Sequence, residues 1–296
     1  MERRIDLHMH STISDGVLTP KEIIDEAVKN NVDTISITDH DNVGAYTEEL
    51  YDYAKEKNIN LIRGVEISTQ KNVGVHILGY NLDLNNKELI DTLYKLRNAR
   101  HIYLHDVSKR LVELGYKVSV EELDKIDSVT KAHISSDIVN NKENEELLIK
   151  TFGYVPERGE FIETIMNEGC PAYVPKITVS PKEASDVIKN AGGKVVLAHP
   201  VAYKYEDDLE IEDIQKLVDE MNPDGIEANY LYVDRNDNRV DEVEKWKSFA
   251  KKNNKFVTIG SDFHKKDGLR PEIGFVNWDI DISNQELEEI INNIIE

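Results

Sequence analysis

Histidine and acidic residues recur in this sequence in short, closely spaced groups. His8 and His10 are two residues apart, and Asp262 and His264 repeat that spacing near the other end of the chain. Residues two apart on a strand share one face, so each pair could reach a common metal ion. The other candidate ligands are Asp15, His40, Glu66, His76 and His199. Imidazoles and carboxylates without thiolates favour a catalytic metal cluster over a structural zinc site.

These nine candidate ligands exceed the number that one metal ion can use. We therefore expect two or three divalent ions that share a bridging carboxylate. Mn²⁺ is favoured, and Fe²⁺ or Zn²⁺ suits the same donors. Asp39 is expected to orient the neighbouring His40 by accepting a hydrogen bond, rather than to bind a metal. Glu227 also ends a predicted strand, and its role as a ligand or as a simple lining residue stays open.

The elements that must position these residues alternate between strands and helices. Strands are expected at residues 4–9, 34–38, 60–68, 73–79, 194–198, 225–228 and 255–259. Helices are expected at residues 19–30, 46–57, 181–190, 241–252 and 285–295. This order predicts an α/β fold with a mostly parallel sheet wrapped by helices. Most candidate ligands end a predicted strand, and in a parallel barrel these strand ends converge on one mouth.

The pattern changes between about residues 85 and 171, where helical periodicity appears without a clear strand. A long helix is expected from about residue 89 to residue 114. We interpret residues 100–172 as an inserted helical subdomain that caps the substrate. Residues 1–99 and 173–296 would then form the domain that carries the metals.

Charge and composition exclude several classes of protein. The chain has 57 acidic against 36 basic residues, a net charge of −21, which excludes a broad basic surface for duplex nucleic acid or for an anionic membrane. A single cysteine, Cys170, excludes an intrachain disulfide framework. No stretch reaches the roughly 18 apolar residues of a membrane helix, and the first residues lack the apolar segment of a secretory signal. A cytoplasmic protein is therefore expected.

Four short motifs resemble those of the PHP family, named for polymerase and histidinol phosphatase. They are HMH at 8–10, TDH at 38–40, AHP at 198–200 and SDFH at 261–264, and Glu66 and His76 fill the intervening ligand positions. The resemblance implies a metal-dependent phosphoesterase with a distorted (β/α)7, TIM-like barrel.

The resemblance also implies how the ligands are shared among the metals. One ion would be held by His8, His10, Glu66 and Asp262. Glu66 would bridge to a second ion, held also by His76 and His199. A third site would use Asp15, His40 and His264, and many members of the family carry histidine where Asp15 stands.

The inserted segment resembles the subfamily of 3′,5′-nucleoside bisphosphate phosphatases, through AHI at 132–134 and CPAYVPK at 170–176. This implies removal of the 3′-phosphate from molecules such as pAp, and some relatives also trim short 5′-phosphorylated RNA. In the subfamily, arginines of the insertion bind the 5′-phosphate. The matching candidates here are Arg97, Arg100, Lys131, His133 and Lys176. Thr130–Lys131 replaces an expected Gly-Arg, so Lys131 would act as a point charge and not as a bidentate fork.

The mechanism implied is attack on phosphorus by a water that the metals activate. His264, Asp262 or a metal-bound water could protonate the leaving oxygen. The expected substrate is a small phosphorylated nucleotide or a short oligonucleotide, and the question of protein partners stays open. Histidinol-phosphate phosphatase or another small phosphomonoesterase is the alternative, which the insertion disfavours. A non-catalytic, metal-dependent nucleotide-binding module is disfavoured by the full ligand set.

Overall fold

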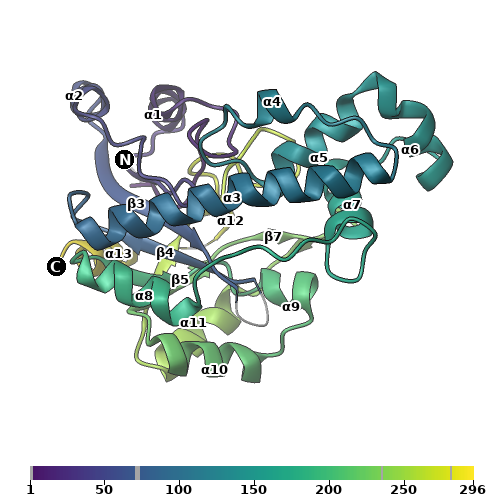
Figure 1. The fold of residues 1–296 in the computed structure, drawn as a ribbon. Helices are drawn as coiled ribbons and strands as arrows, with labels where there is room; N and C mark the ends of the chain where they lie inside the picture. The colour runs from purple at the N-terminus through teal and green to yellow at the C-terminus, as the bar shows by residue number, and fades with distance from the viewer. Residues whose placement is uncertain (1–2, 71–73, 235, 281) are drawn as a thin grey trace. The chain divides into compact units, whose positions relative to one another are not determined.

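The chain forms two compact units. The computed structural model describes residues 3–70, 74–234, 236–280 and 282–296 (Figure 1). One unit comprises residues 1–93 and 179–296, and the other comprises residues 94–178. The long helix α3 (Lys87–Glu113) begins in the first unit and continues into the second. The first unit is therefore built from two segments of chain, with the second unit inserted between them.

The first unit is built around a sheet that, among the described residues, has seven strands in the order β1-β2-β3-β4-β5-β6-β9. These are β1 (Ile5–Asp6), β2 (Thr34–Ile37), β3 (Asn60–Ser68), β4 (His76–Tyr80), β5 (Lys194–Leu197), β6 (Gly225–Asn229) and β9 (Phe256–Ile259). All neighbours pair in parallel except β4, which is antiparallel to β3 and β5. The Leu7 amide donates to the Ile259 carbonyl (3.1 Å), and Met9 bridges to Phe263. The sheet is thus a nearly closed barrel, which confirms the predicted distorted (β/α)7 fold.

Helices surround this barrel. They are α1 (Pro20–Lys29), α2 (Glu48–Glu56), α8 (Pro181–Asn190), α9 (Ala202–Asp207), α10 (Ile211–Met221), α11 (Val243–Lys252), α12 (Val276–Asp279) and α13 (Asn284–Ile295). Helix α8 packs on β4 and β5 (Figure 1), and α11 packs on β6 and β9. Apolar side chains such as Ile5, Leu78, Val196 and Ile259 are fully buried in the core of this unit, and their removal from water stabilises the barrel.

The direction of β4 decides where His76 lies. The strand predicted at 73–79 begins at Val73, which lies outside the described residues, and the observed strand starts at His76. Because β4 runs antiparallel to β3, His76 pairs with Ser68, the last residue of β3. The first residue of β4 therefore lies at the same end of the barrel as the carboxyl ends of the parallel strands.

The second unit is helical, and its described residues contain no strand. After α3 it consists of α4 (Val120–Leu123), α5 (Lys131–Asn140), α6 (Glu145–Phe152) and α7 (Arg158–Phe161), with a 3₁₀ turn at Lys142–Asn144 and a π turn at Ile162–Met166. Leu104, Leu148 and Met166 are buried in a core of its own. The segment expected as an insertion, residues 100–172, lies inside this unit.

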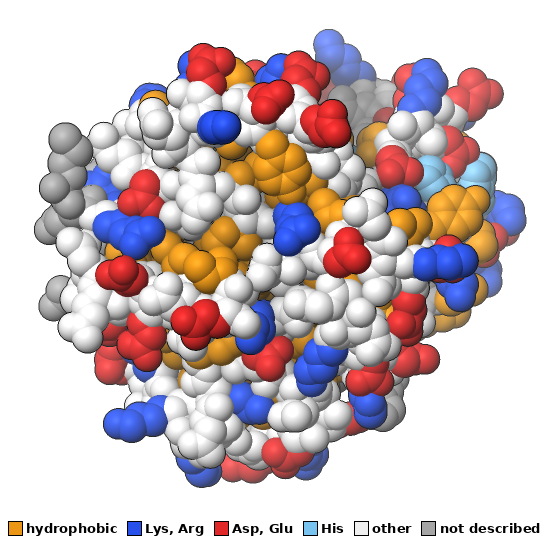
Figure 2. Space-filling view, turned by 90° about the vertical axis from the view of Figure 1, so that its left-hand side faces the viewer, with side chains coloured by type: hydrophobic (Ala, Val, Ile, Leu, Met, Phe, Trp, Pro, Cys, Tyr) orange, Lys and Arg blue, Asp and Glu red, His pale blue; other side chains and the backbone are white. Residues whose placement is uncertain are grey.

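The visible surface mixes charges of both signs. On the face drawn in Figure 2, Lys and Arg side chains are interspersed with Asp and Glu side chains, and apolar groups are exposed between them. This face therefore has no continuous basic stripe. Among the described residues, no helix combines the length and the apolar composition that crossing a bilayer requires.

Candidate metal centre

The nine predicted ligands lie together at one end of the barrel. His8, His10 and Asp15 follow β1; His40 follows β2, Glu66 lies on β3, His76 begins β4, His199 follows β5, and Asp262 and His264 follow β9. Their nitrogen and oxygen atoms form four overlapping groups, and within each group the atoms lie within 4.8 Å of one another. The barrel thus brings together side chains that are up to 256 positions apart in the sequence because its strand ends share one mouth.

Glu66 is the central carboxylate of this cluster. Its Oε2 lies 3.1 Å from His10 Nε2 and 3.1 Å from His40 Nδ1. Its Oε1 lies 2.9 Å from His76 Nδ1 and 3.2 Å from His199 Nε2. Glu66 is 1 % exposed, so both of its carboxylate oxygens face these imidazoles and not solvent. A carboxylate that faces a different set of imidazoles with each oxygen has the geometry of a bridging ligand.

Asp262 is the second carboxylate. Its Oδ1 lies 3.4 Å from His8 Nε2, 3.2 Å from His10 Nε2 and 3.5 Å from His264 Nδ1. Asp262 and His199 have backbone φ angles of 51° and 23°, in the left-handed region that residues other than glycine rarely adopt. Such strain is characteristic of functional sites, where the surrounding fold holds a side chain in one direction.

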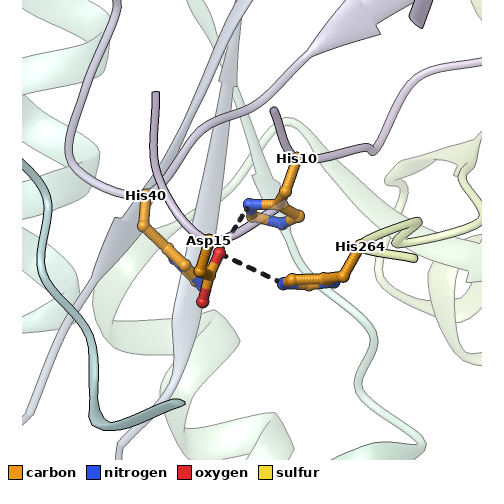
Figure 3. Close-up of side chains that lie close together, drawn as sticks. All are labelled: His10, Asp15, His40 and His264. Carbon is orange, nitrogen blue, oxygen red and sulfur yellow. Dashed lines mark ion pairs between the residues drawn. The ribbon is translucent and has the colours of Figure 1, made fainter. Parts of the chain in front are cut away.

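Asp15 is the third carboxylate, and it lies between His40 and the His10–His264 pair (Figure 3). Its Oδ1 lies 3.3 Å from His264 Nε2 and 3.7 Å from His10 Nδ1, while its Oδ2 lies 3.9 Å from His40 Nε2. The rings of His10 and His264 stack with their centroids 4.1 Å apart. These four residues form one of the four groups that could hold a metal ion.

Several buried atoms of the cluster lack hydrogen bonds. Among the described residues, no hydrogen-bond partner exists for Asp15 Oδ1, His40 Nδ1, Glu66 Oε2 or His199 Nδ1. Leaving a buried polar atom unpaired costs about 1–3 kcal/mol, and more for a charged group. Lone pairs from imidazoles and carboxylates that converge without donors fit divalent cations. The cluster is therefore able to hold metal ions.

The charges of the cluster are strongly coupled. Burial would raise the pKa of Asp15, Glu66 and Asp262, but the adjacent imidazoles outweigh it and hold each pKa well below its usual range. Burial would lower the pKa of His10, but the adjacent carboxylates of Asp262 and Glu66 raise it to about 10. Protons and metal ions therefore compete for the same nitrogen atoms.

Two further carboxylates support the ligands without joining them. Asp39 accepts hydrogen bonds from the Ser11 amide (2.7 Å), the Ser11 hydroxyl (2.7 Å) and the Ser14 hydroxyl (2.6 Å). These bonds fix the loop after β1 that carries Asp15, and the expectation that Asp39 orients His40 stays a prediction. Glu227 approaches His8 Nδ1 (3.0 Å) and accepts from the His199 amide (2.8 Å).

Tyr230 is a contact of the cluster that the sequence did not single out. Its hydroxyl donates to Asp262 Oδ2 at 3.1 Å. Burial and the charge of Asp262 raise the pKa of Tyr230 well above its ordinary value. One tyrosine among 13 carries no pattern of its own, and the only available signal was its position directly after strand β6.

Two of the predicted phosphate-binding residues lie on helix α3 of the second unit. Arg97 Nε pairs with Asp127 Oδ2 at 3.1 Å. Arg100 is 3 % exposed and donates to the Val129 carbonyl at 3.4 Å. Both guanidinium groups thus point to the loop that precedes helix α5.

The remaining candidates of this unit are Lys131 and His133, at the start of α5, and Lys176, close to the end of the unit. Lys131 Nζ donates to Asn167 Oδ1 at 3.0 Å. His133 Nδ1 accepts from the Thr130 amide at 3.1 Å, so this nitrogen takes part in the N-cap of α5. Lys176 is half-buried. Four of the five candidates therefore gather around residues 127–131.

Comparisons with known proteins point in the same direction. A family model described as the PHP domain matches residues 6–191. A 5′-3′ exoribonuclease from Haemophilus influenzae is 30% identical over 268 residues, which cover 89% of this chain and 91% of the relative. A 3′,5′-nucleoside bisphosphate phosphatase from Chromobacterium violaceum is 27% identical over 265 residues, 88% of this chain and 87% of the relative. A solved structure of a proposed metal-dependent phosphoesterase from Bifidobacterium adolescentis shares the fold, with a TM-score of 0.76, 22% identity and coverage of 100% and 97%.

Proposed function

The chain belongs to the PHP domain family and is a metal-dependent phosphoesterase, and we propose that it cleaves the phosphoester on the 3′ oxygen of a nucleotide that also carries a 5′-phosphate. A 3′,5′-nucleoside bisphosphate such as pAp is the smallest substrate of this kind. A short 5′-phosphorylated RNA presents the same P–O3′ bond, with a further nucleoside on the phosphorus. The observation that carries the proposal is the buried cluster centred on Glu66.

We propose three metal sites that share the ligands as the family does: His8, His10, Glu66 and Asp262; Glu66, His76 and His199; and Asp15, His40 and His264. The unpaired buried atoms of the cluster support this assignment. Mn²⁺ is the proposed occupant, and the donors, which are imidazoles and carboxylates without thiolate, also suit Fe²⁺ or Zn²⁺. Bound divalent cations supply a lowered pKa for water and neutralise the charge that develops on the phosphate.

The chain's own residues differ in their access to a substrate. His8 and His10 side chains are fully buried, whereas His264 is 14 % and Asp262 is 20 % exposed. We therefore assign His8 and His10 to holding the centre, and His264 or Asp262 to moving a proton at the leaving 3′ oxygen. Tyr230 supports this assignment because its hydroxyl fixes the Asp262 carboxylate.

The second unit supplies the group that would recognise the 5′-phosphate. Arg97 and Arg100 reach the loop at 127–131, and Lys131 begins helix α5, whose amino end favours an anion. Arginine can bind phosphate oxygens through two parallel hydrogen bonds. We propose that these three cations bind the 5′-phosphate, and that His133 and Lys176 stand at the margin of the site.

A substrate panel tests the function. The purified chain with Mn²⁺ is assayed on pAp, on short RNA with a 5′-phosphate, on the same RNA with a 5′-hydroxyl, and on histidinol phosphate. We expect phosphate release from pAp and nucleotide release from the 5′-phosphorylated RNA, with much slower reactions on the other two. Preferential hydrolysis of histidinol phosphate would overturn the substrate assignment. Binding of pAp without turnover of any compound would establish a nucleotide-binding module instead.

A further inference from the structure

A buried glutamate of the barrel contacts two predicted metal ligands without being one. Glu227 lies on β6 and is 1 % exposed. None of the four groups of described residues that could hold a metal includes it. Its Oε1 and Oε2 lie 3.0 Å and 3.1 Å from His8 Nδ1, and its Oε2 accepts a hydrogen bond from the His199 amide at 2.8 Å. The carboxylate of Glu227 therefore contacts two residues that we propose as metal ligands, His8 and His199.

The contact with His8 decides which nitrogen of that ring is free. A carboxylate at Nδ1 favours the tautomer that carries its proton there, so the lone pair is left on Nε2. His8 Nε2 in turn faces Asp262 Oδ1 at 3.4 Å and Glu66 Oε2 at 3.5 Å. Glu227 therefore directs the donor atom of His8 toward the two carboxylates of the cluster.

The contact with His199 acts on the backbone. His199 has a φ of 23°, which a non-glycine residue adopts only when its surroundings hold it there. The hydrogen bond from its amide to Glu227 is one such restraint. His8 follows β1 and His199 follows β5, and these strands are not neighbours in the sheet. One carboxylate thus links ligands from two separate parts of the barrel wall.

Gly260 shows how closely this arrangement is packed. A Cβ at position 260 would lie 2.3 Å from His8 Cβ and 2.5 Å from Glu227 Oε1. Neither distance is compatible with a normal contact, so only glycine at this position leaves room for the His8–Glu227 pair. The backbone at Gly260, directly after β9, therefore packs against both His8 and Glu227.

We propose that Glu227 is a positioning residue that fixes the direction of His8 and the backbone of His199, and thereby sets the spacing between two metal sites. The inference rests on the proposed metal centre. A buried carboxylate that served stability alone would have no reason to take both of its partners from the ligand set. Loss of such a supporting group typically lowers metal affinity about 10–100-fold.

The test measures metal binding directly. The Mn²⁺ dissociation constant and stoichiometry are determined for the full chain with Glu227→Gln, Glu227→Asp and Glu227→Ala, together with the Tm of each metal-free protein. Glutamine keeps the volume and one acceptor oxygen, but it removes the negative charge beside His8 and puts an NH₂ donor in place of the second oxygen. We expect the dissociation constant to rise about 10–100-fold for Gln and Ala, and less for Asp.

A matched control separates positioning from stability. Asn229 lies on the same strand, is fully buried and donates to the Thr258 carbonyl, and among the described residues its side chain has no hydrogen bond to a proposed ligand. Asn229→Ala should lower the Tm and leave the Mn²⁺ dissociation constant unchanged. If the Glu227 variants behave like Asn229→Ala, Glu227 is a structural residue and the proposal is wrong. A wild-type chain that binds no Mn²⁺ would instead contradict the metal centre itself.

Discussion

Among the single residues of the cluster, His10 is the one that contacts all three carboxylates. Its Nε2 faces Glu66 and Asp262, and its Nδ1 faces Asp15. Changing this imidazole therefore removes a contact from each of the three carboxylates, whereas His76 and His199 each contact Glu66 alone among them.

We predict that His10→Ala lowers kcat by more than about 100-fold, because even supporting groups of a metal site are worth 10–100-fold. The fold should persist, since residues at a barrel mouth serve chemistry more than packing. Steady-state kinetics and circular dichroism measure the two effects. His105→Ala is the control, because His105 is half-exposed on α3 and lies outside the cluster. Normal turnover by His10→Ala would contradict the assignment of the centre.

Arg100 allows a test of phosphate recognition at the same scale. We predict that Arg100→Ala raises KM for pAp about 10–100-fold, which corresponds to the roughly 1.5–3 kcal/mol of a hydrogen bond to a charged group. Arg100→Lys should fall in between, because lysine keeps the charge and loses the fork. The measurement compares KM for pAp with KM for 3′-AMP, which has no 5′-phosphate.

Comparing KM for the two substrates distinguishes the loss of a 5′-phosphate contact from a general disturbance of the second unit. Arg100 is buried, so its removal could weaken both reactions equally through the fold. Arg110→Ala, an exposed change on the same helix, should leave both KM values unchanged. An equal rise in KM for pAp and 3′-AMP after Arg100→Ala would remove Arg100 from the 5′-phosphate site.

At the scale of elements, the helices of the barrel begin where local chemistry dictates. Helix α8 starts at Pro181, and the Ser180 hydroxyl accepts from the Glu183 amide while Glu183 reaches back to the Ser180 amide. Replacing an N-cap serine by alanine costs about 0.5–2 kcal/mol. We predict that Ser180→Ala lowers the free energy of unfolding by about 1 kcal/mol without changing kcat.

Chemical denaturation monitored by circular dichroism provides the measurement for Ser180→Ala. Lys182→Ala, on the exposed side of the same helix, should have an effect below about 0.5 kcal/mol, as expected for a surface site. If the two variants lose equal stability, the cap does not explain where α8 begins.

Such signals explain which elements could be predicted from the sequence. Thr19–Pro20 and Ser180–Pro181 mark the starts of α1 and α8, and both helices begin where expected. Helix α10 was missed because its N-cap is Glu210, which carries no comparable signal. The strand expected at 4–9 is shorter as β1, because Leu7 and Met9 contact the residues of the last strand and its following loop instead.

The residue types of the candidate site were predictable, but its supporting contacts were not. Histidines and acids at strand ends can be identified in the sequence because the barrel makes those ends converge. The contacts of Glu227 with His8 and of Tyr230 with Asp262 join positions 219 and 32 residues apart. Such pairs depend on how strands face one another across the barrel, and no local pattern records them.

For the whole molecule, the division into two units separates the proposed tasks. All nine proposed metal ligands belong to the first unit, and the five candidate residues for the 5′-phosphate belong to the second. Variants in the first unit should therefore act mainly on kcat and metal content, and variants in the second mainly on KM. The chain has a net charge of −21, which repels an anionic substrate. Bound metals in the first unit and basic side chains in the second would each compensate this repulsion locally.

Metal binding should depend on pH through the whole cluster. In the metal-free chain the pKa of His10 is raised to about 10, so this imidazole stays protonated at neutral pH. A metal requires the neutral ring, and binding therefore releases protons. We predict that the apparent Mn²⁺ dissociation constant falls as pH rises from about 6.5 to about 8.5, with proton release detected by calorimetry in buffers of different ionisation enthalpy.

Stability should follow the same linkage with a defined sign. A histidine whose pKa rises from 6.5 to about 10 on folding stabilises the metal-free fold below pH 6.5, and this stabilisation is lost as pH increases toward 10. The metal-loaded fold gains stability over the same range because binding becomes tighter. The difference in Tm between loaded and chelator-treated protein should therefore widen with pH. A constant difference across this range would show that the cluster binds its metals without displacing protons, and the charge coupling of His10 with Asp262 and Glu66 would have to be abandoned.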